Sequence, residues 1–284
     1  IGGLLSIGYN GNVTEQVIVN ITGNFNGTNV LVGTKNGDNI LNVGKADGER
    51  TKVHFGQLGA FADVNVVNAD VTYGYAFVRN DFNATNSTFE IKGGVNTYFS
   101  GNAKVVLDNT TWALPGHANI GSYGGYMYGN ADVTLKNGSS MTATNLGVEV
   151  SGEKVVKLTL EDNSSLTATK LTNQGSIVLA SVTASLNSNE CANVTTSVPN
   201  QVVSYIDGKY TLVAAIAQIG GTAYTSLQAA INAVKDGETI TLVDNVTGNI
   251  TLTEKVGLHY TIDGAGKTMN GKITITPLSD ENDN

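Results

Sequence analysis

Residues 131–144 of the chain, ADVTLKNGSSMTAT, return in similar form as VKLTLEDNSSLTAT over residues 156–169. Further upstream, the stretch 101–109 (GNAKVVLDN) resembles the stretch 129–137 (GNADVTLKN). Self-similarity at such periods is typical of solenoids, in which each repeat buries its apolar face against its neighbours. The repeats therefore predict an elongated stack of similar units.

Each repeat has alternating apolar residues, a turn of Asn or Asp with Ser or Thr, and then a bulky apolar residue. The turns recur at 68–71, 86–89, 109–112, 137–141 and 162–166, about 18 to 28 residues apart. Because side chains alternate between the faces of a strand, one inward face is expected to hold Val105, Leu107, Val133, Leu135, Leu158 and Leu160. The pattern predicts an all-β fold, a right-handed parallel β-helix with coils stacked about 4.8 Å apart.

The main structural alternative is a β-sandwich of the kind found in tandem adhesin domains. A sandwich predicts hairpin turns every 8–12 residues or so, without self-similarity between successive units. Insertions such as residues 121–126 (GSYGGY) are expected on the outside of the solenoid. The unequal repeat lengths argue against a strict array such as leucine-rich repeats.

The residue pattern changes near Ile219, where a helix pattern replaces the strand repeats. Residues 223–237 contain the convincing helix pattern of the chain, which predicts one short capping helix near residues 225–235. Apolar residues at the spacing i, i+3, i+4, i+7 give this helix one apolar stripe: Leu227, Ala230, Ile231 and Val234. Thr225 or Ser226 is expected to cap its N-terminus, and Gly237 to stand at its C′ position. Strand patterns follow at 239–243, 249–252, 259–264 and 271–275.

Two stretches, Tyr224 to Leu242 and Ile262 to Thr268, carry a family resemblance. The chain resembles the opening of pectin-lyase-like β-helix domains in large surface proteins of bacteria and archaea. There, a helix with this pattern caps the first coil, and an Ile-Asp-Gly turn follows one coil later. The resemblance implies the fold and leaves function open, because the same cap precedes lyases, adhesins and proteins of unknown role.

Composition excludes several classes of function. Charged residues make up 14% of the 284 residues, and the net charge is −8. The 16 Lys and Arg residues are too few to form a basic surface for a phosphate backbone, so we expect no nucleic-acid partner. No apolar run reaches the roughly 18 residues of a membrane helix, so we expect no membrane insertion within this segment. The single cysteine, Cys191, cannot form an internal disulfide.

No catalytic, cofactor or metal site is predicted. Lyases and hydrolases on this fold need clustered carboxylates, whereas the aspartates of this chain are scattered, mostly at strand ends and turns. The three histidines, His54, His117 and His259, lack metal-binding spacing. The GAGKT sequence at 264–268 lacks the first glycine of a phosphate loop, and the acidic tail at 280–284 lacks the spacing of a calcium loop.

Two sets of residues are candidates for surface contacts. Tyrosines recur from repeat to repeat and predict either core packing or an aromatic contact strip for glycans or another protomer, formed by Tyr73, Tyr75, Tyr98, Tyr123, Tyr126 and Tyr128. Eleven Asn-x-Ser/Thr motifs are candidates for N-glycosylation: Asn12, Asn20, Asn26, Asn83, Asn86, Asn109, Asn137, Asn163, Asn193, Asn245 and Asn249. The recurring turn provides an alternative, structural reason for these motifs.

Together these patterns predict a strand-rich N-terminal segment (1–32), β-helix coils (33–215), and a cap-like helix with further coils and an acidic tail (216–284). We expect a non-enzymatic extracellular module of the cell surface, structural or adhesive. Its expected partners are further copies of itself, joined head to tail into a filament, or a glycan or protein of a host or cell surface. The rival interpretation is a polysaccharide lyase or glycoside hydrolase on the same fold.

Overall fold

The computed structural model describes residues 4–7, 16–27, 29–32, 39–60, 63–92, 96–125, 127–253 and 256–277. Within them the chain is all-β, with long parallel sheets and one helix, so the predicted all-β class is confirmed. The chain forms two compact units, Ile1–Ser197 with Tyr205–Thr211, and Val198–Ser204 with Leu212–Asn284. Residues 1–32 therefore belong to the first unit.

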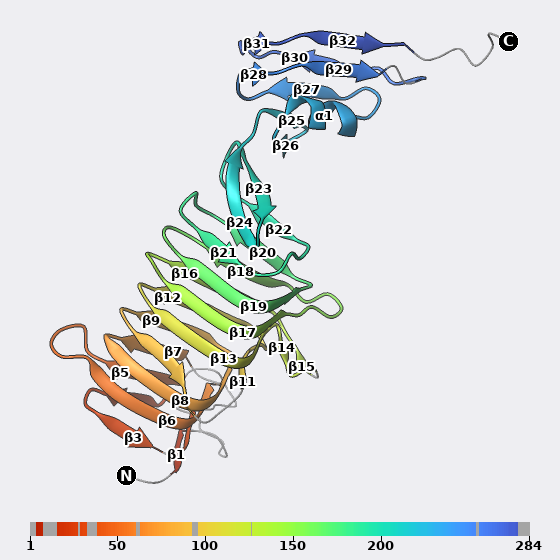
Figure 1. Cartoon of the computed structure of the whole chain (residues 1–284). Coiled ribbons are helices and arrows are strands. Elements are labelled where there is room, and N and C mark those ends of the chain that lie inside the picture. Colours follow the sequence, from red (N-terminus) through yellow and green to blue (C-terminus); the bar gives the residue numbers. More distant parts are fainter. Residues whose placement is uncertain are drawn as a thin grey trace. The chain divides into compact units, whose positions relative to one another are not determined.

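The strands from the N-terminus to residue 214 lie mainly in two long sheets (Figure 1). Among the described residues, the 13-stranded sheet A contains β1 (Leu4–Ile7), β3 (Phe25–Gly27), β4 (Asn29–Val32), β6 (Thr51–Ala60), β8 (Ala69–Val78), β10 (Thr88–Ile91), β11 (Asn96–Phe99), β13 (Thr111–Ile120), β17 (Ser140–Val148), β19 (Ser165–Asn173), β21 (Ser185–Asn187), β23 (Gln201–Ile206) and β24 (Lys209–Ala214). The nine-stranded sheet B contains β2 (Ile18–Ile21), β5 (Ile40–Gly44), β7 (Asp63–Val67), β9 (Asp81–Thr85), β12 (Ala103–Asp108), β16 (Ala131–Lys136), β18 (Val156–Leu160), β20 (Ser176–Leu179) and β22 (Val194–Thr196).

The chain passes back and forth between these sheets. From β5 to β10, each strand joins the sheet that its predecessor does not occupy, and neighbours within a sheet run parallel. Each circuit of chain thus adds one strand to both sheets. The circuits differ in length, since Ile177 pairs with Val194 across a short circuit and Ala103 pairs with Ala131 across a long one. These long parallel sheets are compatible with a β-helix and differ from the hairpins that a sandwich predicts.

The pairing register follows the sequence repeats. Leu135 pairs with Leu160 and Ser140 with Ser165, which are the partners that the two similar stretches align. The six residues predicted to share an inward face are each 0% exposed: Val105, Leu107, Val133, Leu135, Leu158 and Leu160. That prediction is confirmed. The glycine of the repeat has a packing reason, because a Cβ on Gly129 would lie 2.2 Å from the backbone nitrogen of Gly101 in the neighbouring circuit.

The asparagines of the recurring turn adopt left-handed backbone conformations. Their φ angles are 49° at Asn68, 49° at Asn86, 47° at Asn109, 52° at Asn137 and 56° at Asn163. Asn109 Nδ2 donates to Asn86 Oδ1, and Asn86 Nδ2 donates to Asn68 Oδ1, each at 3.3 Å. Asparagine enters the left-handed region more readily than other side-chain-bearing residues and bonds locally. These two properties explain why it recurs in the turn.

Hydroxyl residues one or two positions after three of these asparagines, Ser87, Thr110 and Ser139, form a second, buried ladder. The backbone N–H of Ala69 donates to Ser87 Oγ at 3.1 Å, and the N–H of Ser87 donates to Thr110 Oγ1 at 3.3 Å. The N–H of Thr110 in turn donates to Ser139 Oγ at 3.0 Å. Because a buried N–H without a partner is costly, the short hydroxyl side chain stabilises the corner that the asparagine turns.

A pair of substitutions at Asn109 tests this account of the turns. Asn109→Ala is expected to be about 1 kcal/mol less stable than Asn109→Gly, because only glycine adopts positive φ without steric cost. The matched control is Asn83, which lies in strand β9. Its side-chain Nδ2 donates the same kind of hydrogen bond, to Asn65 Oδ1 at 3.3 Å. There the order should reverse, with Gly the less stable by about 0.5 kcal/mol. Denaturant unfolding measures all four variants; the same order at both sites would contradict the account.

The parallel circuits end earlier than predicted. Residues 201–214, assigned from sequence to the coils, instead form strands β23 and β24, and β24 pairs antiparallel to β21 through Leu186 and Tyr210. Tyr210 is 3% exposed, and its hydroxyl accepts from the Cys191 N–H and donates to the Cys191 carbonyl at 3.0 Å. The antiparallel strand β24 ends the parallel stacking at this edge of sheet A. The alternation of apolar residues does not show the direction of a strand, so it could not predict this end.

The second unit contains the remaining elements: β25 (Ala217–Ile219), β26 (Thr222–Tyr224), α1 (Leu227–Ala233), β27 (Thr239–Leu242), β28 (Val246–Thr247), β29 (Ile250–Thr253), β30 (Thr261–Asp263), β31 (Met269–Asn270) and β32 (Ile273–Thr276). Ser226 caps α1 by accepting from the Ala229 N–H at 3.1 Å. The predicted apolar stripe of the helix is buried in a small core with β25, β27, β28 and β29. Gly237 is not the C′ residue, because the helix already ends at its C-cap Val234.

Candidate functional site

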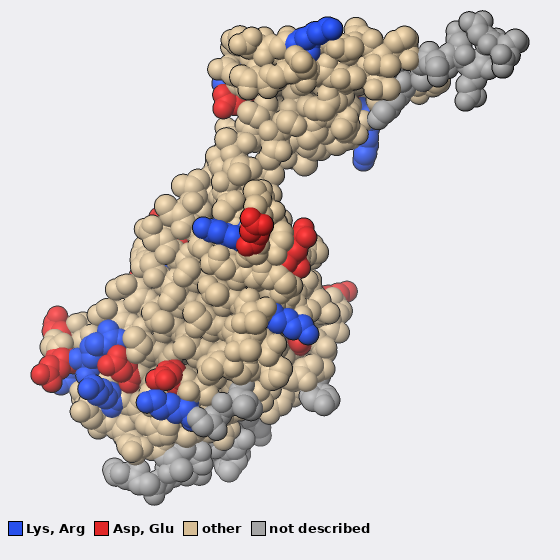
Figure 2. Space-filling model, in the orientation of Figure 1, with Lys and Arg blue, Asp and Glu red and all other residues tan. Residues whose placement is uncertain are grey.

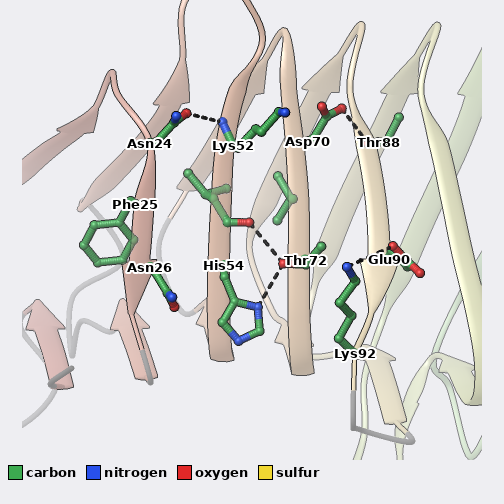
Figure 3. Close-up of a pocket in the computed structure, with 12 residues that line it drawn as sticks. Asn24, Phe25, Asn26, Lys52, His54, Asp70, Thr72, Thr88, Glu90 and Lys92 are labelled. Atoms are coloured by element: carbon green, nitrogen blue, oxygen red, sulfur yellow. Dashed lines mark hydrogen bonds and ion pairs between the residues drawn. The ribbon is translucent and has the colours of Figure 1, made fainter. Parts of the chain in front are cut away.

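A polar groove of about 610 Å³ crosses β3, β6, β8 and β10 on the first unit (Figure 3). Its floor follows from strand alternation: on β6, Val53 and Phe55 are buried, so Lys52 and His54 face the groove. The parallel register aligns the outward positions in two rows. One row holds Lys52, Asp70 and Thr88, and the other holds His54, Thr72 and Glu90.

Asp70 is the most strongly bound acid of the groove. It accepts a hydrogen bond from Arg50 Nε at 2.7 Å and another from Thr88 Oγ1 at 2.9 Å. Burial alone would raise the pKa of Asp70, but these bonds and the charges of Arg50 and Lys52 outweigh burial and lower it. Asp70 is therefore an ionised acceptor, poorly suited to donate a proton.

The second row holds a histidine, a threonine and an acid. His54 Nδ1 lies 2.9 Å from Thr72 Oγ1, and the Thr72 hydroxyl donates to the Val53 carbonyl at 3.3 Å. Thr72 has one hydroxyl hydrogen to share between these two contacts, and which atom donates between His54 Nδ1 and Thr72 Oγ1 depends on the imidazole tautomer. Glu90 and Lys92 form an exposed ion pair at 3.8 Å. The groove thus offers both hydrogen-bond donors and acceptors along its open floor.

From the sequence we expected no acids of neighbouring strands to share a groove, and that expectation was wrong for two of them. Asp70 on β8 and Glu90 on β10 line the same groove. The reason is the register, which places Asp70 beside Thr88 and Thr72 beside Glu90. The same sequence spacing joins Lys52 to Asp70 and Asp70 to Thr88. That spacing was the signal that could have identified Lys52, His54, Glu90 and Lys92 as neighbours.

A second groove, of about 360 Å³, continues the first along sheet A. It shares Glu90 and runs over β13, β17 and β19. Its polar lining changes from charged groups to hydroxyls, with Thr142 and Thr167 paired in register. The two grooves meet at Glu90 and together touch seven neighbouring strands, β3, β6, β8, β10, β13, β17 and β19.

The tyrosines of the predicted aromatic strip do not form one strip: one is buried in the core, and three others contact one another. Tyr73 is 0% exposed, and its hydroxyl contacts Thr97 Oγ1 at 2.9 Å, so it belongs to the core and to no surface strip. Tyr75, Tyr98 and Tyr123 do come together, with ring centroids 5.9 Å apart for Tyr75 and Tyr98 and 4.7 Å apart for Tyr98 and Tyr123. Burial, reinforced by neighbouring Tyr123, raises the pKa of both Tyr75 and Tyr98.

Tyr128 lies in a small antiparallel excursion of the chain. Ser122–Tyr123 (β14) pairs antiparallel with Met127–Tyr128 (β15), and Gly124 and Gly125 between them are exposed. Tyr128 is 38% exposed, whereas Tyr126 lies outside the described residues. Whether these rings bind a ligand stays a prediction.

Several of the predicted glycosylation sites have structural roles. Asn86 and Asn109 bond to neighbouring turns as described above, Asn137 Nδ2 donates to Asp108 Oδ1 at 2.8 Å, and Asn20 Oδ1 accepts from Asn42 at 2.9 Å. In the second unit, Asn245 Oδ1 accepts from the Thr268 N–H at 2.9 Å. These bonds account for the recurrence of asparagine without a glycan. Asn12 lies outside the described residues, and glycosylation of the others stays a prediction.

The described part of the chain holds no cluster of three or more His, Cys, Asp or Glu side chains suited to a metal ion. None of its helices is long and apolar enough to cross a membrane. The acidic tail at 280–284 lies outside the described residues. Figure 2 shows few charged side chains on the face in view, with both signs mixed. Burial, foremost, raises the pKa of Cys191, so its thiol is not activated.

Comparison with known proteins gives no relative from which a function can be transferred. No known protein family, curated protein or solved structure matches this chain. The groove and the register of the strands are therefore the observations on which a function can be argued.

Proposed function

We propose that the chain is a right-handed β-solenoid that serves as a non-catalytic adhesive module of the cell surface and binds a glycan in the polar groove of sheet A. The observation that carries this proposal is the path of two adjoining grooves, lined by charged and hydroxyl side chains, across seven parallel strands. Such a path runs across the strands and suits an extended polymer better than a compact small molecule, which is usually held in an enclosed apolar pocket.

The chemistry of the lining favours a saccharide as the extended ligand. Sugar hydroxyls both donate and accept, and the groove offers donors on Lys52 and Lys92 and acceptors on Asp70 and Glu90. Because two lysines and two acids line the groove, their charges balance and do not select a strongly charged polymer. Half-buried Phe25 at one end of the groove adds an apolar ring against which a sugar face can pack.

One observation supports the alternative, an enzyme that cleaves polysaccharides. Asp70 and Glu90 share the groove with His54 and two lysines, and paired acids or an acid beside a base are what hydrolases and lyases use. Against this, Asp70 is held ionised by Arg50 and Thr88, and the groove lacks the acid cluster that would hold Ca²⁺ within the described residues. The binding role therefore fits the groove better.

Binding of the full-length chain to an array of neutral and acidic glycans tests the proposal. The double variant Glu90→Ala/Lys92→Ala should bind its glycan at least about tenfold more weakly, because each charged group contributes about 1.5–3 kcal/mol to a hydrogen bond. Glu153→Ala/Lys154→Ala is the matched control, since this exposed pair lies in a turn outside the groove. It should bind like the wild type.

Two outcomes would contradict the proposal. Equal binding by the groove variant and the wild type would remove the groove as the site, as would the absence of any glycan binding. Unsaturated or hydrolysed products that appear when the wild type is incubated with pectin, alginate or similar polymers, with or without Ca²⁺, would establish the enzymatic alternative instead.

A further inference from the structure

The outer side of sheet B carries charged residues in an alternating order. In β9, β12 and β16, buried residues alternate with exposed or half-buried ones, so every second side chain faces outward. The register aligns the same outward position of four consecutive strands, β9, β12, β16 and β18. These four positions hold exposed residues of alternating charge, called the alternating row below: Asp81, Lys104, Asp132 and Lys157.

The charges of the alternating row are not neutralised within the chain. No ion pair of the described residues involves a member of the row, although its members lie on paired strands. The charged residues four positions further along β12 and β16 differ in this respect. Lys136 lies 3.4 Å from Asp108, and Asn137 donates to Asp108 at 2.8 Å. The alternating row therefore has charges to offer to a partner.

Neutral side chains branched at Cβ lie next to the alternating row. Val106, Thr134 and Thr159 occupy one outward position of β12, β16 and β18, and Val178 continues the line on β20. Val106, Thr134 and Val178 are half-buried, and Thr159 is 7% exposed. Such short side chains allow a second sheet to approach to the usual distance of about 10 Å. This line suits the centre of an interface, with the charged residues at its rim.

We propose that sheet B of one copy packs face to face on sheet B of a second copy, about a two-fold axis that runs parallel to the strands between β12 and β16. This operation reverses the order of the strands, so β12 faces β16 of the second copy and β9 faces its β18. Lys104 then lies opposite Asp132 of the second copy, and Asp81 lies opposite its Lys157. Every charge of the row meets its opposite, as an isologous interface requires. This inference does not rest on the glycan groove, which lies on sheet A.

The internal pairing of Asp108 favours this axis over one that runs across the strands. An axis across the strands would place Lys104 opposite Asp108 of the second copy. That carboxylate already has Lys136 and Asn137 as partners. The axis parallel to the strands instead joins two sets of charges that have no ion-pair partner among the described residues. Charges without a partner gain more from a new contact than charges that are already paired.

The size of the shared face predicts a weak dimer. The six strands from β7 to β20 span about 29 Å at a spacing of about 4.8 Å, and a strand of five residues is about 17 Å long. The facing area is therefore about 500 Å² on each copy and about 1,000 Å² in total, which is the lower limit for a specific interface. We expect a Kd in the micromolar range that rises with salt concentration, because exposed ion pairs are screened.

Charge-reversal variants of the full-length chain test the proposal. Lys104→Glu and Asp132→Lys each turn an attraction that occurs twice in the dimer into a repulsion, so each should raise the dimer Kd at least about tenfold. The double variant Lys104→Glu/Asp132→Lys restores opposite charges across the axis, and its Kd should lie within about threefold of the wild-type value. An equimolar mixture of the two single variants should also form dimers, because one copy then offers two acids where the other offers two bases. Sedimentation velocity over a concentration series measures each case.

Lys170→Glu is the matched control, because this exposed lysine lies on β19 of sheet A, outside the proposed contact. It should dimerise like the wild type. A wild type that stays monomeric at millimolar concentration would overturn the proposal, as would single variants that dimerise as well as the wild type. Dimers that are lost in both single variants but not restored in the double variant would overturn it in favour of an axis across the strands. Circular dichroism melting of each variant separates a lost contact from a lost fold.

Discussion

Leu160→Asp is expected to unfold the first unit or to destabilise it by about 4 kcal/mol or more. Leu160 is 0% exposed and pairs in register with Leu135 on one side and Leu179 on the other, and both neighbours are also 0% exposed. The carboxylate would be buried between two leucines without a partner, and an uncompensated buried charge is among the few changes with so large an effect. Such a loss is comparable with the total stability of many domains.

The control for this substitution lies on the same strand. Lys157 is exposed on the outer side of β18, and Lys157→Asp introduces the same side chain there. Its stability should stay within about 0.5 kcal/mol of the wild type. Denaturant unfolding followed by circular dichroism measures both variants. If Leu160→Asp unfolds at the same denaturant concentration as Lys157→Asp, the inward ladder of leucines does not carry the stability of the unit.

The register of the sheets could be predicted because residues at equivalent positions of successive repeats pair with one another. In a stack of parallel strands, a given position faces the same environment in every circuit, so selection of apolar residues at Leu135 also applies at Leu160. The asparagine of the turn adds a second, independent marker, since its left-handed φ leaves few alternatives to Asn and Gly. Two markers that recur together define the register without any knowledge of the fold.

The place of the tyrosines could not be predicted from alternation, because β8 changes its inward face midway. Val71 and Tyr73 are buried, but after Tyr75 the buried residues are Ala76, Phe77 and Val78. The change falls at Gly74, where a Cβ would lie 2.5 Å from the Gly56 carbonyl oxygen of the neighbouring strand. A close backbone approach of this kind turns the strand, and a period of two carried across it assigns the next residues to the wrong face.

The groove was missed for a different reason. Its residues become neighbours only through the pairing of β6, β8 and β10, and a list of acids in sequence order does not show which of them share an outward row. The hairpin of β23 and β24 was missed because its alternating apolar residues look like those of a coil. Antiparallel pairing with β21 is a property of the edge at which the stack ends, and it has no signature in the repeat itself.

Trp112→Ala is the second substitution with a large expected effect. Trp112 is the only tryptophan of the chain, is 0% exposed and stacks on Phe89 with ring centroids 4.6 Å apart. Phe82 and Phe99 lie against it at 5.3 and 5.1 Å, and its Nε1–H donates to the Tyr73 hydroxyl. Removing the ring leaves a cavity among large side chains, which costs about 3–5 kcal/mol.

A milder variant separates the two contributions of this residue. Trp112→Phe keeps an aromatic ring in the stack but removes the donor to Tyr73, whose hydroxyl retains its contact with Thr97. Because the Tyr73 hydroxyl remains partnered, Trp112→Phe should cost only about 1–2 kcal/mol. Far-UV circular dichroism is the suitable probe, since both variants lack the single tryptophan fluorophore. Equal losses of unfolding free energy in the two variants would show that the hydrogen bond to Tyr73 is the main contribution of Trp112. A much larger loss in Trp112→Ala, as expected, would show that ring packing is the main contribution.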